Sequence, residues 1–222
     1  MFCIYYIPHQ LSELNGVNIL KDKRISALKK LMSILVIDDK EFSYLEALQK
    51  YEFNITQKND LTHLSDVAEY DVILCDIRGV GKFLKSDFEG ANLIKELKIK
   101  YPNKTIIAYT ANDYNASFQK YLNYADMIVP KGNLALEDWV TTLEDLLKES
   151  ADPVKQWEKT RGALLEANVS TIDVAKYESE YVKAIKDGSF ESFEKLYSNK
   201  KTNGSGILME LASSVIAKVL KP

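Results

Sequence analysis

The sequence has few of the residues on which several protein classes depend. Its two cysteines, Cys3 and Cys75, cannot build a disulfide framework or a four-ligand zinc site, and its two histidines, His9 and His63, cannot build a histidine-rich metal cluster. With 9 glycines and 5 prolines in 222 residues, the chain also lacks the composition of collagen-like or low-complexity proteins. So few cysteines fit a reducing compartment, and we predict a cytoplasmic protein.

The chain also lacks a strong charge of one sign. Its 29 lysines and arginines against 32 aspartates and glutamates leave a net charge of −3, which gives no general electrostatic reason to bind nucleic acid or an anionic membrane. The opening MFCIYYIP is apolar, but it has no basic region before it and is too short to cross a bilayer. We therefore interpret it as a strand and expect no membrane association.

Hydrophobic residues make up 46% of the chain, enough for a sizeable core, and from Ser33 onward they form short runs that alternate with amphipathic stretches. The runs predict buried strands at 33–38, 53–56, 71–76, 105–110 and 126–130. The stretches between them predict helices at 41–51, 61–70, 90–101, 112–122 and 134–150. This alternation predicts an α/β fold over residues 33–150, a doubly wound five-stranded parallel sheet with helices on both faces.

The two flanking parts of the chain differ from this pattern. Residues 1–32 form an N-terminal extension with one expected strand, Phe2 to Ile7, and a basic helix near 21–31, and no role follows from its sequence. Residues 151–222 show no strand pattern and predict an all-helical region. Its helices are expected at 153–167, 172–186, 190–197 and 207–220, with a flexible connector at 200–206 and a wide apolar face on the last helix.

Polar residues follow the predicted strands at the ends where a parallel sheet gathers its ligands. Asp38 and Asp39 close the first strand, Asp76 the third and Thr110 the fourth, and Lys131 follows the fifth. Three carboxylates brought together repel one another unless a hard divalent cation binds them, and Mg²⁺ is the natural occupant. A lysine and a hydroxyl beside them would suit a phosphoryl group that bridges the metal and the lysine.

Over residues 33–149 the sequence resembles the receiver domain of two-component response regulators, the CheY-like superfamily. The resemblance rests on the acidic pair in LVIDDKEF, the aspartate in VILCDIRG, the threonine followed by alanine in IIAYTAN and the lysine in IVPKG. These motifs occur in the family's order, each at the right strand end. The flavodoxin-like receiver fold of this family is also the fold that the strand pattern predicts.

The resemblance implies a phospho-accepting signalling protein and not an enzyme. Asp76 would accept a phosphoryl group from a sensor histidine kinase or a phosphotransfer protein, and the receiver would assist its own phosphorylation and dephosphorylation. The implied Mg²⁺ ligands are Asp39, Asp76, the backbone carbonyl of Arg78 and, through water, Asp38. The implied phosphoryl-binding and switch residues are Thr110, Ala111 and Lys131.

Two features depart from the family's pattern. The loop after Asp76 is several residues longer than usual, and Val80 stands where a proline is normally found. Ile128 stands at the fifth-strand position that is commonly aromatic. The usual aromatic switch is therefore absent, or is replaced by Tyr109 or Tyr124.

Simpler interpretations stay open. Taken alone, Asp39 could cap a helix and Lys131 could be a solvated turn residue, and the whole site could belong to a scaffold that keeps the receiver fold without phosphotransfer. Residues 151–222 hold eleven lysines and arginines and ten aspartates and glutamates, so they lack the basic face of a DNA-binding domain. We expect them to bind a protein partner or to form a homodimer. A transcription factor with an atypical helical DNA reader is the alternative.

Overall fold

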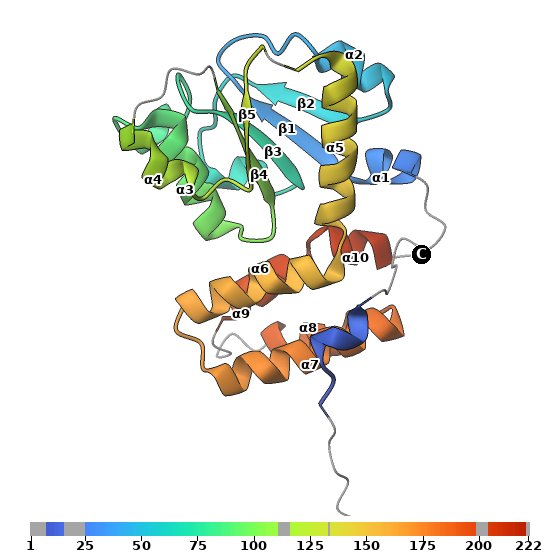
Figure 1. Ribbon diagram of the computed structural model, residues 1–222. Coiled ribbons are helices and arrows are strands. Elements are labelled where there is room, and N and C mark those ends of the chain that lie inside the picture. The colour runs from blue at the N-terminus through green and yellow to red at the C-terminus, as the bar shows by residue number, and fades with distance from the viewer. Residues whose placement is uncertain (1–7, 16–24, 111–115, 133, 199–203, 221–222) are drawn as a thin grey trace, which may run out of the picture. The chain divides into compact units, whose positions relative to one another are not determined.

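The computed structural model describes residues 8–15, 25–110, 116–132, 134–198 and 204–220. The chain divides into two compact units (Figure 1). A sheet unit is formed by Asp22–Ser150, and a helical unit is formed by Met1–Lys21 together with Ala151–Pro222. The predicted strand at 2–7 lies outside the described residues, as do residues 21–24 of the predicted basic helix and most of the predicted connector at 200–206.

The sheet unit is built on five parallel strands in the order β2-β1-β3-β4-β5. The strands are β1 (Ser33–Ile37), β2 (Asn54–Lys58), β3 (Val72–Asp76), β4 (Thr105–Thr110) and β5 (Met127–Pro130). Every residue of β3 and β4 is buried, as expected for short apolar runs in a sheet covered on both faces. This strand order is the flavodoxin-like one, and its switch point lies between β1 and β3, so the predicted fold is confirmed.

Helices cover both faces of the sheet (Figure 1). On one face lie α1 (Ile25–Leu31), α2 (Leu45–Lys50) and α5 (Leu136–Ser150), and both α1 and α2 contact α5. On the other face α3 (Glu89–Lys100) packs against α4 (Gln119–Leu122). Leu93, Ile94 and Leu97 of α3 are fully buried in the core on that face. The described part of the chain contains no helix long and apolar enough to cross a membrane.

Three of the predicted helices differ in the structure, and the one predicted at 41–51 is limited to α2, Leu45–Lys50. The helix predicted at 61–70 is wrong, because only a single 3-10 turn, η2 (Leu64–Val67), forms there. The carboxylate of Asp66 accepts hydrogen bonds from the backbone N–H groups of Thr62 and His63, and this side-chain bonding competes with an α-helix. Within the helix predicted at 112–122, the structure describes a 3-10 turn, η4 (Ala116–Phe118), followed by α4.

The helical unit contains α6 (Pro153–Glu166), α7 (Thr171–Asp187), α8 (Glu191–Ser198), α9 (Ser205–Ala212) and α10 (Val215–Leu220). The prediction of a single helix at 207–220 is wrong, because the helix is interrupted between α9 and α10. There the hydroxyl of Ser213 donates to the carbonyl of Glu210 and competes with the helical backbone bonds. The core of the unit is aromatic, with Trp157 stacked on Tyr181 at 5.1 Å between ring centroids.

The N-terminal residues are shared between the two units. A short 3-10 helix, η1 (Leu11–Leu14), packs on α6 and α7 and so belongs to the helical unit. Helix α1 belongs to the sheet unit, where the ammonium group of Lys29 pairs with the Glu144 carboxylate of α5 at 2.7 Å. The helical unit is therefore built from both ends of the chain, and the sheet unit is inserted between them.

Candidate functional site

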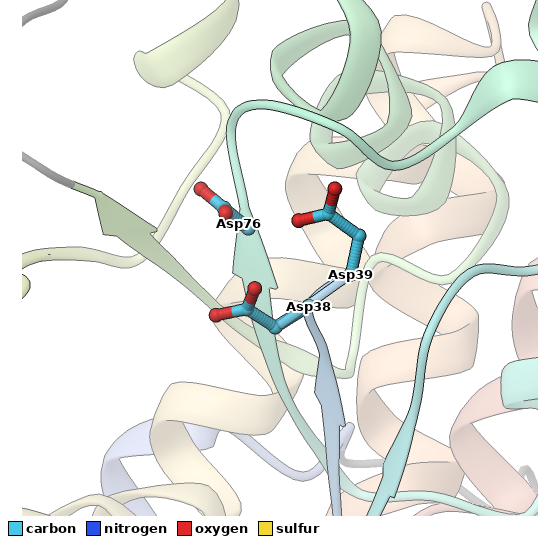
Figure 2. A group of neighbouring side chains, drawn as sticks. All are labelled: Asp38, Asp39 and Asp76. Carbon is cyan, nitrogen blue, oxygen red and sulfur yellow. The ribbon is translucent and has the colours of Figure 1, made fainter. Parts of the chain in front are cut away.

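The pairing of β1 with β3 brings three carboxylates together. Ile37 at the end of β1 pairs with Cys75, so the residues that follow, Asp38 and Asp76, lie side by side at the carboxyl edge of the sheet. Figure 2 shows Asp39 beside them, and one carboxylate oxygen from each of the three residues lies within 4.8 Å of the others. The structure thus gathers these carboxylates at the switch point of the sheet.

Lys131 reaches the same cluster from the end of β5. Its ammonium nitrogen Nζ lies 2.6 Å from Oδ2 of Asp38 and 2.5 Å from Oδ2 of Asp76. Its backbone N–H donates to the carbonyl oxygen of Thr110 at 2.6 Å, so the start of the loop is fixed to the end of β4. Thr110 itself is only 2% exposed. One ammonium group therefore bridges the buried carboxylates of two neighbouring strands.

Burial sets the electrostatics of the cluster. Asp38 and Asp76 are 2% and 6% exposed, whereas Asp39 is exposed. Burial raises the pKa of Asp76 above its usual value, and the opposing attraction of Lys131 does not cancel that effect. For Lys131, burial lowers the pKa, but the hydrogen bonds to Asp38 and Asp76 outweigh it and leave a raised pKa. The lysine therefore stays charged, whereas burial at the sheet edge disfavours the ionised form of Asp76.

The residues present fit a hard divalent cation. Three carboxylates offer oxygen ligands within 4.8 Å of one another, which is the donor chemistry that Mg²⁺ and Ca²⁺ prefer. Gly79 lies directly over the exposed member of the set, because a Cβ atom there would come within 2.5 Å of Oδ2 of Asp39. Its φ of +74° also favours glycine. Glycine at this position therefore lets the loop after β3 approach the carboxylates without backbone strain or displacement of Asp39.

The sequence reasoning missed several residues that shape the loop between Asp76 and α3. A Cβ atom on Gly90 would lie 1.9 Å from the backbone oxygen of Asp76, so this glycine lets α3 begin directly against the end of β3. The carboxylate of Glu89 accepts the N–H of Gly79 at 2.9 Å. Asp60 accepts the N–H of Gly81 at 2.6 Å. The glycines in DIRGVG and FEGAN were the available signal for this folded loop.

Two further site residues were predicted, and the structure describes one of them, Arg78. The backbone N–H of Arg78 donates to Oδ1 of Asp76 at 3.3 Å, while its guanidinium group lies over the ring of Phe118, 4.3 Å from the centroid. The side chain of Arg78 thus points to an aromatic ring, and only its backbone is bonded to the acidic residue. Ala111 lies outside the described residues.

An aromatic cluster adjoins the charged one. Nζ of Lys131 lies 4.9 Å from the centroid of the Tyr109 ring, and that ring packs edge-on against Phe42 and Trp139 at 5.5 and 5.6 Å between centroids. Tyr124, the other aromatic residue singled out from the sequence, is 37% exposed at the surface. Of the two, Tyr109 is the one in contact with the candidate switch lysine, and it connects that lysine to Trp139 in α5.

Cys75 and His63 are two other side chains that could carry chemistry. Cys75 is fully buried, and burial raises the pKa of its thiol well above the usual value. Its Sγ donates to the backbone oxygen of Asp76 at 3.3 Å. His63 is exposed at the start of η2, where its Nδ1 lies 3.1 Å from the hydroxyl of Thr62. Neither residue contributes to the acidic cluster.

Comparisons with known proteins found similarity to solved structures only. No protein-family model matches the chain, and no curated protein matches it. Among solved structures, a CheY-like receiver domain protein from Methanospirillum hungatei JF-1 is 20% identical with a TM-score of 0.43, over 54% of this chain and 95% of the other. A response regulator from Thermotoga maritima is 15% identical with a TM-score of 0.42, over 52% and 97%.

A third similar structure is a response regulator from Burkholderia pseudomallei that contains a phosphorylated aspartic acid, a calcium ion and citrate. It is 19% identical with a TM-score of 0.40, over 65% of this chain and 89% of the other. Over about half of its length, the chain is similar to CheY-like receiver domains.

Proposed function

We propose that the acidic cluster is the phosphoacceptor site of a response regulator, in which Asp76 takes a phosphoryl group from a phosphohistidine of a partner protein. The observation that carries this proposal is the position of Lys131. Its ammonium group lies 2.5 Å from Asp76 and 2.6 Å from Asp38, at the switch point where a doubly wound sheet binds ligands. A cation held beside the acceptor carboxylate is the group that would pair with the oxygens of an added phosphoryl group.

The transfer uses a carboxylate as the nucleophile. An oxygen of Asp76 attacks phosphorus, the new P–O bond forms an acyl phosphate, and the P–N bond to the partner's imidazole breaks with its electron pair left on nitrogen. Before the transfer Lys131 pairs with the unmodified carboxylate of Asp76. After the transfer it pairs with oxygens of the phosphoryl group, and the hydroxyl of Thr110 donates to another phosphoryl oxygen. The side chains of this chain thus position the group and neutralise its charge, which is the main work of phosphoryl transfer.

The same cluster would hold Mg²⁺ through Asp39, Asp76 and the backbone carbonyl of Arg78, with Asp38 contributing through water. When bound, the cation would supply charge neutralisation for the transferring phosphoryl oxygens. Asp39 is the exposed member of the cluster, so its carboxylate would be the ligand most open to a hydrated cation.

The output of the proposed switch is the helical unit. The phosphoryl donor in this proposal is a sensor histidine kinase or a phosphotransfer protein in the cytoplasm. The helical unit then binds a protein partner or a second copy of the chain. The contact of Lys131 with Tyr109, and of Tyr109 with Trp139, gives a packed route from the phosphorylated edge to α5, the helix that precedes the helical unit in the chain. A movement of the lysine would change the packing of this aromatic cluster.

A second candidate function is a scaffold that keeps the receiver fold without phosphotransfer. The observation in its favour is again Lys131, because its two short ion pairs hold Asp38 and Asp76 together without any modification. The two candidates make opposite predictions for chemical phosphorylation.

The deciding experiment uses acetyl phosphate and Mg²⁺ as a small-molecule donor. Intact-mass spectrometry of the full chain should show one added phosphoryl group, and Asp76→Asn should abolish it. Asp87→Asn is the matched control, because Asp87 is an exposed aspartate in the loop after β3, and this variant should label normally. Label retained after Asp76→Asn would overturn the assignment, and no label on any chain would favour the scaffold.

A second measurement follows the aromatic cluster. In a Trp157→Phe background Trp139 is the single tryptophan, and its fluorescence should change when beryllofluoride and Mg²⁺ are added together. Tyr109→Leu should reduce that change while Asp76 still labels. An unchanged signal in Tyr109→Leu would mean that this tyrosine does not connect the site to α5.

A further inference from the structure

The N-terminal segment, residues 8–15, is attached to the helical unit through its backbone. The N–H of His9 donates to Oγ of Ser179 at 2.9 Å, and the N–H of Leu11 donates to Oε1 of Glu178 at 3.4 Å. The other carboxylate oxygen of Glu178 accepts the indole N–H of Trp157 at 2.7 Å. Two side chains of α7 thus accept main-chain N–H groups of the segment, as in a peptide-binding surface, and Trp157 of α6 holds one of them in place.

A charged anchor adds specificity to this attachment. Oε2 of Glu13 lies 2.7 Å from Nζ of Lys186 on α7 and 3.1 Å from Nδ1 of His9. Oε1 of the same residue accepts the N–H of Gln10 at 2.7 Å. Leu14, the next residue, is 1% exposed although both of its neighbours are exposed. The segment therefore combines backbone bonds, one acidic anchor and one buried leucine.

One hydrogen bond of the turn lies within the segment. The N–H of Gln10 donates to Oε1 of Glu13, so this bond belongs to the segment wherever the segment docks. The contacts with α7 join residues 167 to 173 positions apart in sequence. None of these contacts requires that the segment and the docking face belong to the same molecule, because every copy of the chain carries both.

We propose that the face formed by α6 and α7 is a docking site for this segment, and that the segment of a second copy can replace the resident one. Exchange in both directions gives a reciprocal dimer in which each helical unit is completed by its partner. The interaction is independent of the acidic cluster in the sheet unit.

Charge reversal tests the exchange in the full chain. In Glu13→Lys the segment carries the same charge as Lys186, and in Lys186→Glu the docking face carries the same charge as Glu13. Each variant alone should lose hydrogen-exchange protection at the amides of His9 and Leu11 and should stay monomeric in light scattering. An equimolar mixture should form a one-to-one dimer, because opposite charges then meet at both docking faces only between the two chains.

The matched control replaces Lys186→Glu by Lys195→Glu, which makes the same charge change on an exposed lysine of α8. Its mixture with Glu13→Lys should stay monomeric. The double variant Glu13→Lys with Lys186→Glu should recover protection in a single chain. A mixture of the two reversal variants that remained monomeric would overturn the exchange, and unchanged protection in both single variants would overturn the anchor.

A labelled peptide of residues 8–15 provides an independent measurement. It should bind Glu13→Lys at least about threefold more tightly than the wild-type chain, whose own segment competes for the face, as expected for the loss of one exposed ion pair. It should bind Lys186→Glu more weakly than Glu13→Lys. Equal binding to all three chains would show that the α6–α7 face does not recognise the segment.

Discussion

The two units use burial in opposite ways. At the edge of the sheet unit, Asp38 and Asp76 are buried as charged groups that repel each other and depend on Lys131. In the helical unit the largest fully buried side chains are aromatic, and the polar atoms of Trp157 and Tyr181 are hydrogen-bonded. The hydroxyl of Tyr181, for example, donates to the carbonyl oxygen of Pro153 at 2.9 Å. The difference indicates that the sheet unit gives up stability for a site, whereas burial in the helical unit serves packing.

The strongest test of this contrast removes the aromatic core of the helical unit. Trp157 is fully buried and stacked on Tyr181, so Trp157→Ala should reduce the free energy of unfolding of that unit by about 3–5 kcal/mol. Hydrogen exchange resolved by peptide should show the loss in α6 to α8, while Asp76 still accepts label. Ile172→Ala, at a residue 69% exposed, is the near-neutral control. Equal loss of protection in β1 and β3 would show that the two units are one cooperative body.

A pair of glycine substitutions compares backbone packing next to the site with backbone packing in the helical unit. Gly90→Ala would place a Cβ atom 1.9 Å from the backbone oxygen of Asp76, and the shift of α3 should cost about 1–3 kcal/mol and weaken labelling. Gly162 in α6 has no atom within 4 Å of such a Cβ, so Gly162→Ala should stabilise the chain by about 0.5–1 kcal/mol. Urea denaturation measures both changes. A harmless Gly90→Ala would mean that α3 does not need its close approach to β3.

Much of the sheet unit could be predicted from the sequence. The five apolar runs became five strands, and the central strands β3 and β4 are buried as predicted. The edge strands β2 and β5 were also predicted to be buried, but they are partly exposed because each has a neighbouring strand on one side only. Once the strands were parallel, their carboxyl ends had to meet, and this placed Asp38, Asp76 and Lys131 together without any knowledge of contacts. The helix predicted at 61–70 failed because Asp66 bonds the backbone before it, a local competition that hydrophobic spacing does not report.

The features that escaped prediction depend on pairs of residues far apart in sequence. Gly79 faces Asp39, and Asp60 holds the N–H of Gly81, so neither contact has a signature in a single segment. The attachment of η1 to α7 is the extreme case, because the N-terminal extension alone gave no sign of its partner. The break between α9 and α10 is different. Ser213 and Ser214 are visible in the sequence, but the apolar face of the predicted helix continues across them.

A smaller effect should appear when the charge at the acceptor position is removed. Burial raises the pKa of Asp76, which means that folding disfavours its ionised form. Without divalent cations, Asp76→Asn should therefore stabilise the sheet unit, by up to about 1 kcal/mol, while it abolishes labelling. Thermal unfolding in the presence of a chelator measures this, with Asp87→Asn as the control. A destabilised Asp76→Asn would mean that the bond to Lys131 outweighs the burial of the charge.

The smallest expected effect is a pH dependence in the helical unit. Hydrogen bonds from Lys186, from the N–H of Gln10 and from His9 lower the pKa of Glu13 from 4.5 to about 2. The contribution of this carboxylate is therefore fully present above about pH 4.5 and is lost as the pH falls through about 2. A titration of the Glu13 carboxyl carbon by NMR should give the lowered value, and Lys186→Ala should raise it. An ordinary value in the wild-type chain would contradict the anchor.

The composition of the helical unit from both ends of the chain has a consequence for the order of folding. The sheet unit is complete once the ribosome has released Ser150, but the docking face for residues 8–15 does not exist until α7 has been synthesised. This segment is made before the sheet unit and must therefore wait for a partner made about 170 residues later. During that interval a finished sheet unit carries an undocked N-terminal segment, and neighbouring chains on one messenger RNA hold such segments at high local concentration.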